Sequence, residues 1–148
     1  MGLRAGTENT HSIVGLDKAL TIAMDHYTED KLNISGLKQY FIQQLSEKVK
    51  GVAFNGLSAD PDRSAFHILN VRFPVEKQMM LFNLDLKGIA ASGGSACQSG
   101  SNKGSHVLAA ILDEEAASHT SIRFSFSKFN TKEEIDIVVK ELTAILDK

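Results

Sequence analysis

Apolar residues recur at helical spacing over the first fifty positions of the chain. The first apolar face consists of Ile13, Leu16, Leu20 and Ala23. The second consists of Leu37, Phe41, Leu45 and Val49. We expect Thr10 or Ser12 to cap the first helix and Gly51 to end the second. The pattern therefore predicts a helical pair, or one long helix that is broken between Thr28 and Lys31.

Two later stretches alternate apolar and polar residues, which is typical of half-buried strands. The first runs from His67 to Phe73, with Ile68, Asn70 and Arg72 on one side of the strand, and is stopped by Pro74. The second is Ser121-Ile-Arg-Phe-Ser-Phe126, in which Arg123 shares the polar face with two serines. Glycine, proline and two aspartates in the segment 55–64 predict a loop between short strands.

Two further helices complete the pattern. The segment 78–86 is apolar nearly all round and predicts a short buried helix. Thr131-Lys-Glu-Glu134 is a capping box and predicts the start of the last helix. The apolar stripe of that helix is Ile135, Val138, Val139, Leu142, Ile145 and Leu146. The order of elements predicts an α+β fold, in which helices cover one face of a small, mostly antiparallel sheet.

The amino-acid composition limits the number of domains, the kinds of partner and the location of the protein. The chain has 148 residues, which is about one domain, and its 43% hydrophobic and 23% charged residues are typical of an ordinary globular protein. A formal net charge of −2 gives no electrostatic reason to expect a nucleic-acid or membrane partner. One cysteine excludes an internal disulfide. That cysteine, with no signal peptide and no bilayer-spanning apolar run, favours a cytoplasmic location.

Cys97 is the strongest candidate for chemistry. It lies within a run of glycine and serine, Ser92-Gly-Gly-Ser-Ala-Cys97-Gln-Ser-Gly-Ser, where a buried structural cysteine would instead have apolar neighbours. Glycine and serine at this density predict a flexible loop. Ser105 would cap a short helix directly after it. The alternative is an ordinary glycine-rich connection that happens to contain a cysteine.

Three other residues have both a functional and a structural interpretation. Arg123 can bind a carboxylate with two parallel hydrogen bonds, or it is a surface arginine on a strand. Thr7 precedes a helix, so that its hydroxyl can bind a phosphate, or it belongs to a plain turn. His106 can assist a thiol, or it faces solvent at the start of a helix. The residues alone leave these alternatives open.

The remaining histidines do not form a metal-binding pattern. They are His11, His26, His67 and His119, and none has ligand spacing to Cys97 or to another histidine. We therefore expect no metal site. A cysteine–histidine hydrolase stays open, because that pairing is spatial and is not encoded in the spacing.

Three motifs in order resemble one family. They are Arg4-Ala-Gly-Thr7-Glu-Asn, the Ser-Ala-Cys97 loop followed by Ser105-His-Val-Leu, and Ile122-Arg-Phe-Ser-Phe followed by Phe129-Asn-Thr-Lys-Glu-Glu-Ile-Asp136. Together they resemble the C-terminal part of the cysteine desulfurases that depend on pyridoxal 5'-phosphate, within the class V aminotransferases. The length of the cysteine loop resembles the longer-loop class, which serves iron–sulfur cluster assembly and tRNA thiolation.

The resemblance implies a role for each of three residues. Cys97 matches the cysteine that takes sulfur from L-cysteine, leaving L-alanine and an enzyme persulfide. Arg123 matches the arginine that pairs with the α-carboxylate of the substrate. Thr7 matches a threonine that contacts the cofactor phosphate in the partner subunit, so that a homodimer shares its sites. A sulfur-acceptor or iron–sulfur scaffold protein would be the partner, and His106 receives no catalytic role.

The cofactor lysine of this family precedes the Arg-Ala-Gly-Thr motif, as do its ring-stacking histidine and its ring-nitrogen aspartate. Lys18 and Lys38 lie on helical patterns without that context. We therefore expect residues 1–148 to be a single C-terminal domain fragment that starts at an expression methionine. Without the large cofactor-binding domain, the fragment would bind no pyridoxal phosphate and would be inactive alone. The alternatives are a selenocysteine lyase or another class V aminotransferase domain, and a standalone sulfur-carrier domain.

Overall fold

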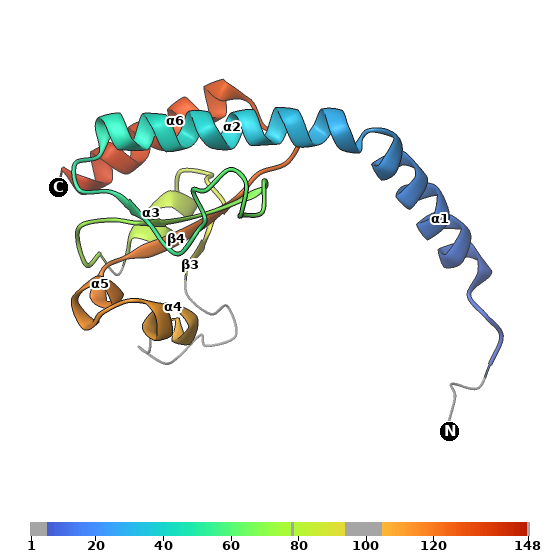
Figure 1. Cartoon of the computed structure of the whole chain (residues 1–148), viewed down its shortest axis with the longest axis horizontal. Helices are drawn as coiled ribbons and strands as arrows, with labels where there is room; N and C mark the ends of the chain where they lie inside the picture. The colour runs from blue at the N-terminus through green and yellow to red at the C-terminus, as the bar shows by residue number, and fades with distance from the viewer. Residues whose placement is uncertain (1–5, 78, 94–104, 148) are drawn as a thin grey trace.

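The computed structural model of the protein describes residues 6–77, 79–93 and 105–147 (Figure 1). The helices are α1 (Thr10–Asp25), α2 (Tyr27–Lys48), α3 (Met80–Asp85), α4 (His106–Ile111), α5 (Glu114–Ser118) and α6 (Lys132–Leu146). The strands are β1 (Ala53–Phe54), β2 (Ile68–Arg72), β3 (Ser92–Gly93) and β4 (Ser121–Ser125).

The strands form one antiparallel sheet in the order β1-β2-β4-β3. The central pair, β2 and β4, is aligned over five residues on each strand, with Asn70 opposite Arg123. The short strand β3 pairs with the other edge of β4, where Ser92 lies opposite Arg123. Both alternating stretches of the sequence are therefore strands, and the predicted α+β fold with an antiparallel sheet is confirmed.

Helices α2 and α6 lie side by side over one face of the sheet (Figure 1). Their inward side chains meet Leu69, Val71, Ile122 and Phe124 of the two central strands, all of which are buried. The ring of Phe41 on α2 packs edge-on against that of Phe124, with 5.0 Å between the ring centroids. Because apolar residues alternate with polar ones on β2 and β4, this packing leaves their polar residues on the opposite face.

The first two helices follow the predicted pattern, with two corrections. The N-cap of α1 is Asn9, whose side chain accepts a hydrogen bond from Ser12 N at 3.2 Å, and neither Thr10 nor Ser12 has that role. The break lies at His26 instead of at residues 28–31. Glu29 and Asp30 fall in the first turn of α2, where negative charge favours a helix start instead of interrupting it.

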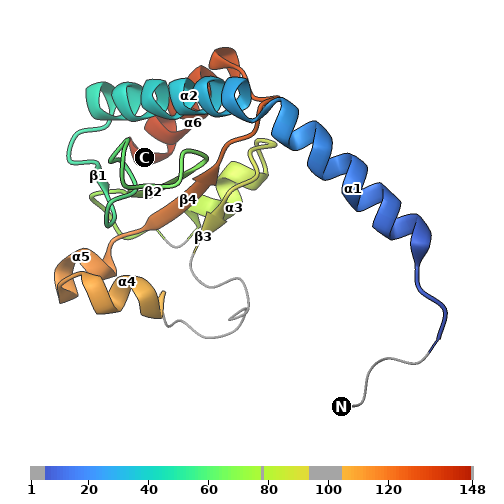
Figure 2. The same cartoon turned by 45° about the vertical axis from the view of Figure 1, so that its right-hand side comes forward.

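Helix α1 extends away from the sheet and its helical layer (Figure 2). None of its residues is buried, and the apolar face predicted from the sequence is exposed to solvent, with Leu16 70% exposed. None of the helices in the described ranges combines the length and the apolar character needed to cross a lipid bilayer.

Helix α3 is shorter and less enclosed than the sequence predicts. It spans six residues, of which Met80 and Leu84 are buried, while Phe82 is 52% exposed. The predicted short helix is therefore confirmed, but its burial is confirmed for one side only. The helix lies near the edge of the sheet and packs against α6 with one side only (Figure 2).

Two short helices, α4 and α5, precede β4. Ser105 caps α4 as predicted, and its hydroxyl accepts a hydrogen bond from Leu108 N at 3.4 Å. Helix α5 was not predicted. It is capped by Asp113, which accepts a hydrogen bond from Ala116 N at 2.8 Å and is followed by two glutamates. The capping aspartate and the two glutamates are a helix-start signal in the sequence. The helix was missed because five residues are too few to show a helical spacing of apolar positions.

The capping box of α6 is confirmed and gives a stability prediction. Thr131 Oγ1 accepts from Glu134 N at 3.2 Å, and Glu134 Oε2 accepts from Thr131 N at 3.1 Å. We expect Thr131→Ala to lower the free energy of unfolding by about 1 kcal/mol, because a backbone N–H of the first turn loses its partner. Urea unfolding measures this change. Thr131→Ser keeps the hydroxyl and is the control, so equal losses in both variants would contradict the assignment.

Candidate functional site

The face of the sheet opposite α2 and α6 is polar and positively charged. Asn70, Arg72 and Arg123 point to this side, because each alternates with buried residues that face the helices. The four described strands contain these two arginines and no aspartate or glutamate. This polar face of the sheet therefore attracts an anion such as a carboxylate.

Arg123 lies at the centre of the polar face. It is exposed and has a neighbour on each side, Asn70 on β2 and Ser92 on β3. Within the described part of the chain, no carboxylate forms an ion pair with it, since the pairs found there join other residues. Its guanidinium is therefore open to a carboxylate from solution, which it can bind with two parallel hydrogen bonds.

A buried asparagine that contacts the polar face was missed by the sequence analysis. Asn55 is 5% exposed, and its Nδ2 donates to Asn70 Oδ1 at 2.8 Å and to Ser121 Oγ at 2.9 Å. Its Oδ1 accepts from Arg72 Nη1 at 3.3 Å. The sequence places Asn70 on the polar side of an alternating strand but contains no signal for Asn55. The link to Asn55 depends on tertiary contacts that the loop sequence does not encode.

Cys97 lies outside the described residues, within the segment 94–104. The described structure ends on one side of this segment at β3 and resumes on the other side at Ser105. Since β3 pairs with β4, the segment that contains Cys97 begins two residues after Ser92, the strand neighbour of Arg123. The role of Cys97 as a nucleophile stays a prediction.

Thr7 and His106 are both exposed and are far apart in the sequence and in the fold. Thr7 lies in the segment before α1, at the end of the molecule remote from the sheet (Figure 2). The chain therefore does not bring Thr7 and Arg123 into one site. His106 is the first residue of α4, where Ser105 provides the cap. In the described ranges, no three histidine, cysteine or acidic side chains are grouped as metal ligands would be.

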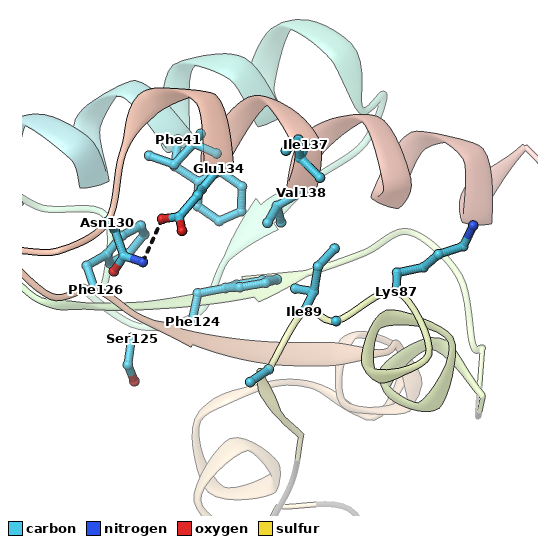
Figure 3. A pocket seen from close by; sticks show the side chains of 13 residues that line it. Phe41, Lys87, Ile89, Phe124, Ser125, Phe126, Asn130, Glu134, Ile137 and Val138 are labelled. Carbon is cyan, nitrogen blue, oxygen red and sulfur yellow. Dashed lines mark hydrogen bonds between the residues drawn. The ribbon is translucent and has the colours of Figure 1, made fainter.

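A cavity of about 430 Å³ lies on the helical side of the sheet (Figure 3). Phe124, Phe126, Ile89 and Val138 give it largely apolar walls. The carboxylate of Glu134 at its rim accepts hydrogen bonds from the Asn130 side chain and the Thr131 backbone, which hold the pKa of Glu134 below its usual range. Arg123 does not line this cavity, so the cavity and the polar face are separate sites.

Lys38 is the one buried lysine among the described residues, and it has a structural partner. Its Nζ donates to Ser64 Oγ at 2.7 Å and to Ala65 O at 2.9 Å, which ties α2 to the loop between β1 and β2. Burial lowers the pKa of Lys38, and the negative charge of Asp60 partly opposes that shift. Lys18 is exposed on α1. Neither lysine belongs to the polar face.

Comparison with known proteins gives a consistent set of relatives. The family described as Aminotransferase class-V matches residues 1–138. A putative cysteine desulfurase IscS 1 of Bacillus subtilis (strain 168) is 39% identical over 147 residues, which cover 98% of this chain and 38% of the relative. A cysteine desulfurase IscS of Clostridium botulinum (strain Hall) is 38% identical over 146 residues, which cover 98% of this chain and 36% of the relative.

Two solved structures have the same fold. A NifS-like protein superposes with a TM-score of 0.77 at 28% identity, over 99% of this chain and 36% of that chain. The NifS-like protein of Rickettsia africae superposes with a TM-score of 0.73 at 28% identity, over 98% of this chain and 37% of that chain. The present chain thus spans little more than a third of the length of the relatives that it matches.

Proposed function

This chain belongs to the class-V aminotransferase family, and from that premise we propose that it is the small domain of a cysteine desulfurase. The complete enzyme takes sulfur from L-cysteine and leaves L-alanine. The observation that carries the proposal is the position of Arg123, exposed and free of acidic partners within the described residues, on a face whose edge strand leads towards Cys97. The desulfurase names of the relatives support the same reaction.

In the proposed reaction, Arg123 binds the α-carboxylate of L-cysteine and holds the substrate at the polar face. The thiolate of Cys97 then attacks the substrate sulfur. An S–S bond forms, the bond between carbon and sulfur breaks, and the carbon takes up a proton. The products are L-alanine and a persulfide on Cys97, so that atoms balance without an external oxidant. A thiolate is the required nucleophile, because a neutral thiol attacks sulfur far more slowly.

The family implies pyridoxal 5'-phosphate as the cofactor. The residue of this chain that fits the cofactor phosphate is Thr7, which is exposed and precedes α1. Its hydroxyl makes no hydrogen bond within the described residues. We propose that Thr7 contacts the phosphate, and that residues beyond this chain hold the rest of the cofactor. When bound, the cofactor supplies the electron-withdrawing ring that makes the carbon–sulfur bond labile. The isolated chain would therefore be inactive.

The site is also proposed to need a second subunit. Thr7 and Arg123 lie in separate parts of the chain, at the far end of α1 and on the sheet. A homodimer would allow Thr7 of one subunit to serve the site that contains the partner's cofactor. The persulfide would pass to a sulfur-acceptor or iron–sulfur scaffold protein, and cytoplasm is the proposed location.

Turnover by the complete enzyme tests the proposal. We expect L-cysteine to give L-alanine, with one sulfide released per alanine when a thiol reductant is present. Selenocysteine is the comparison substrate, because its preferential turnover would make the protein a selenocysteine lyase instead. Transamination without sulfur release would assign another class V activity and contradict the proposal.

A further inference from the structure

We propose that Asn70 is a specificity-determining residue that binds the substrate carboxylate together with Arg123. In this arrangement the Nδ2 of Asn70 donates to one carboxylate oxygen, while the guanidinium of Arg123 holds the carboxylate by its charge and its paired donors. Asn55 fixes the direction in which the amide of Asn70 points. The inference rests on the proposed function, since it concerns the same substrate group.

The orientation of the two amides follows from Arg72. A guanidinium has only donors, so the atom of Asn55 that faces Arg72 Nη1 at 3.3 Å must be Oδ1. The Nδ2 of Asn55 consequently faces Asn70 and Ser121, at 2.8 and 2.9 Å. The oxygen of Asn70 is the acceptor of that bond. Its amide nitrogen is therefore turned away from Asn55.

The amide nitrogen of Asn70 is available to a ligand. Among the described residues it donates no hydrogen bond, since the side-chain bond of Asn70 there uses its oxygen. Every side-chain nitrogen or oxygen that is fully buried among the described residues has a hydrogen-bond partner. Since Asn70 Nδ2 has no partner there, it is not fully buried and can be reached by solvent. A fixed donor without a protein acceptor on a cationic face fits an anionic ligand.

The ladder between β2 and β4 brings Asn70 close to Arg123. Phe126 N donates to His67 O at 2.8 Å, which identifies a hydrogen-bonded pair. Hydrogen-bonded and non-hydrogen-bonded pairs alternate along an antiparallel ladder. The pair Asn70–Arg123 lies three positions along the ladder from the pair His67–Phe126. It is therefore a non-hydrogen-bonded pair, the kind whose Cα atoms lie only about 4.5 Å apart and whose side chains are closest.

Asparagine suits this position better than a second cation would. A carboxylate accepts up to about four hydrogen bonds on its two oxygens, more than one guanidinium fork supplies. The amide adds a donor without repelling Arg123. A substrate that lacks the carboxylate leaves both groups without an acceptor, so the pair favours α-amino acids over amines.

The test is Asn70→Asp in the complete enzyme. Aspartate keeps the oxygen that accepts from Asn55, but it replaces the donor with a carboxylate that pairs with Arg123 and repels the substrate. We expect the KM for L-cysteine to rise about 10- to 100-fold with kcat changed much less. Inhibition by L-alanine should weaken by a similar factor, because alanine carries the same carboxylate and needs no chemistry.

Asn33→Asp adds the same charge on the exposed surface of α2 and is the matched control, expected to keep the KM of the unaltered enzyme. If Asn70→Asp fails to fold by thermal unfolding, Asn70→Ser removes the amide donor without adding charge. A fall in kcat with unchanged KM and unchanged inhibition by L-alanine would overturn the inference. Arg123→Ala separates the two proposals: an unchanged KM there overturns the proposed role of Arg123, whereas a raised KM with no effect at Asn70 overturns only the present inference.

Discussion

Cys97→Ala in the complete enzyme is expected to abolish sulfur release from L-cysteine while the cofactor stays bound. Cys97 is the only cysteine of this chain, so the substitution removes its sole thiol. Neither the carboxylate partner, Arg123, nor the proposed phosphate contact, Thr7, is altered. The chemical step then lacks its nucleophile, and a hydrocarbon side chain cannot accept sulfur. Alanine and sulfide production, followed together with cofactor absorbance, measures the outcome.

Ser99→Ala changes the same segment without touching the thiol and is the matched control, expected to keep its activity. Mass spectrometry of the peptide that contains Cys97 provides a second readout. After one turnover without reductant, that peptide should gain the mass of one sulfur atom. Near-normal sulfur transfer by Cys97→Ala, or a persulfide found only on another peptide, would contradict the assignment of the nucleophile.

The parts of the fold that were predicted correctly have short-range causes. The alternation on β2 and β4 separates a buried face from a polar one, so strand identity and the facing of Arg123 follow from the sequence. The capping box of α6 is likewise a contact between residues three positions apart. Such features depend on neighbours in the chain and are therefore readable from it.

The features that the sequence did not predict are those that depend on tertiary packing. Helix α3 looks buried by composition, but one side of it faces solvent because the sheet edge and α6 cover only the other. The sequence places Lys38 on a helical pattern and contains no signal of its burial, yet the loop from Asp60 to Ala65 encloses it. Both outcomes depend on segments that lie beside these residues only after folding.

The candidate site likewise combines residues that the sequence points to with residues that only the fold brings together. Arg123 was proposed from strand alternation together with the family resemblance, and Cys97 from the composition of its loop together with the same resemblance, and both roles stay predictions. Asn70 was seen only as a polar strand residue, because its place beside Arg123 depends on the register of two strands that are far apart in the sequence. Asn55 had no sequence signal at all, since its partners come from β2 and β4.

Arg123→Ala tests the binding half of the mechanism. The substitution removes a charged, paired set of hydrogen bonds to the substrate carboxylate, which is worth on the order of 2 kcal/mol or more. We therefore expect kcat/KM for L-cysteine to fall at least about 30-fold. Cofactor absorbance should be unchanged, because Arg123 is proposed to contact the substrate carboxylate and not the cofactor.

Arg123→Lys should recover part of this loss. Lysine keeps the positive charge but binds the carboxylate as a point charge, without the two parallel donors of a guanidinium. Arg63→Ala removes another exposed arginine, one that pairs with Asp60 in a loop, and is the control for loss of surface charge. If Arg123→Ala behaves like Arg63→Ala, with kcat/KM nearly intact, Arg123 is the surface strand arginine that the sequence alone also allows. The substrate carboxylate would then be bound by residues outside the polar face.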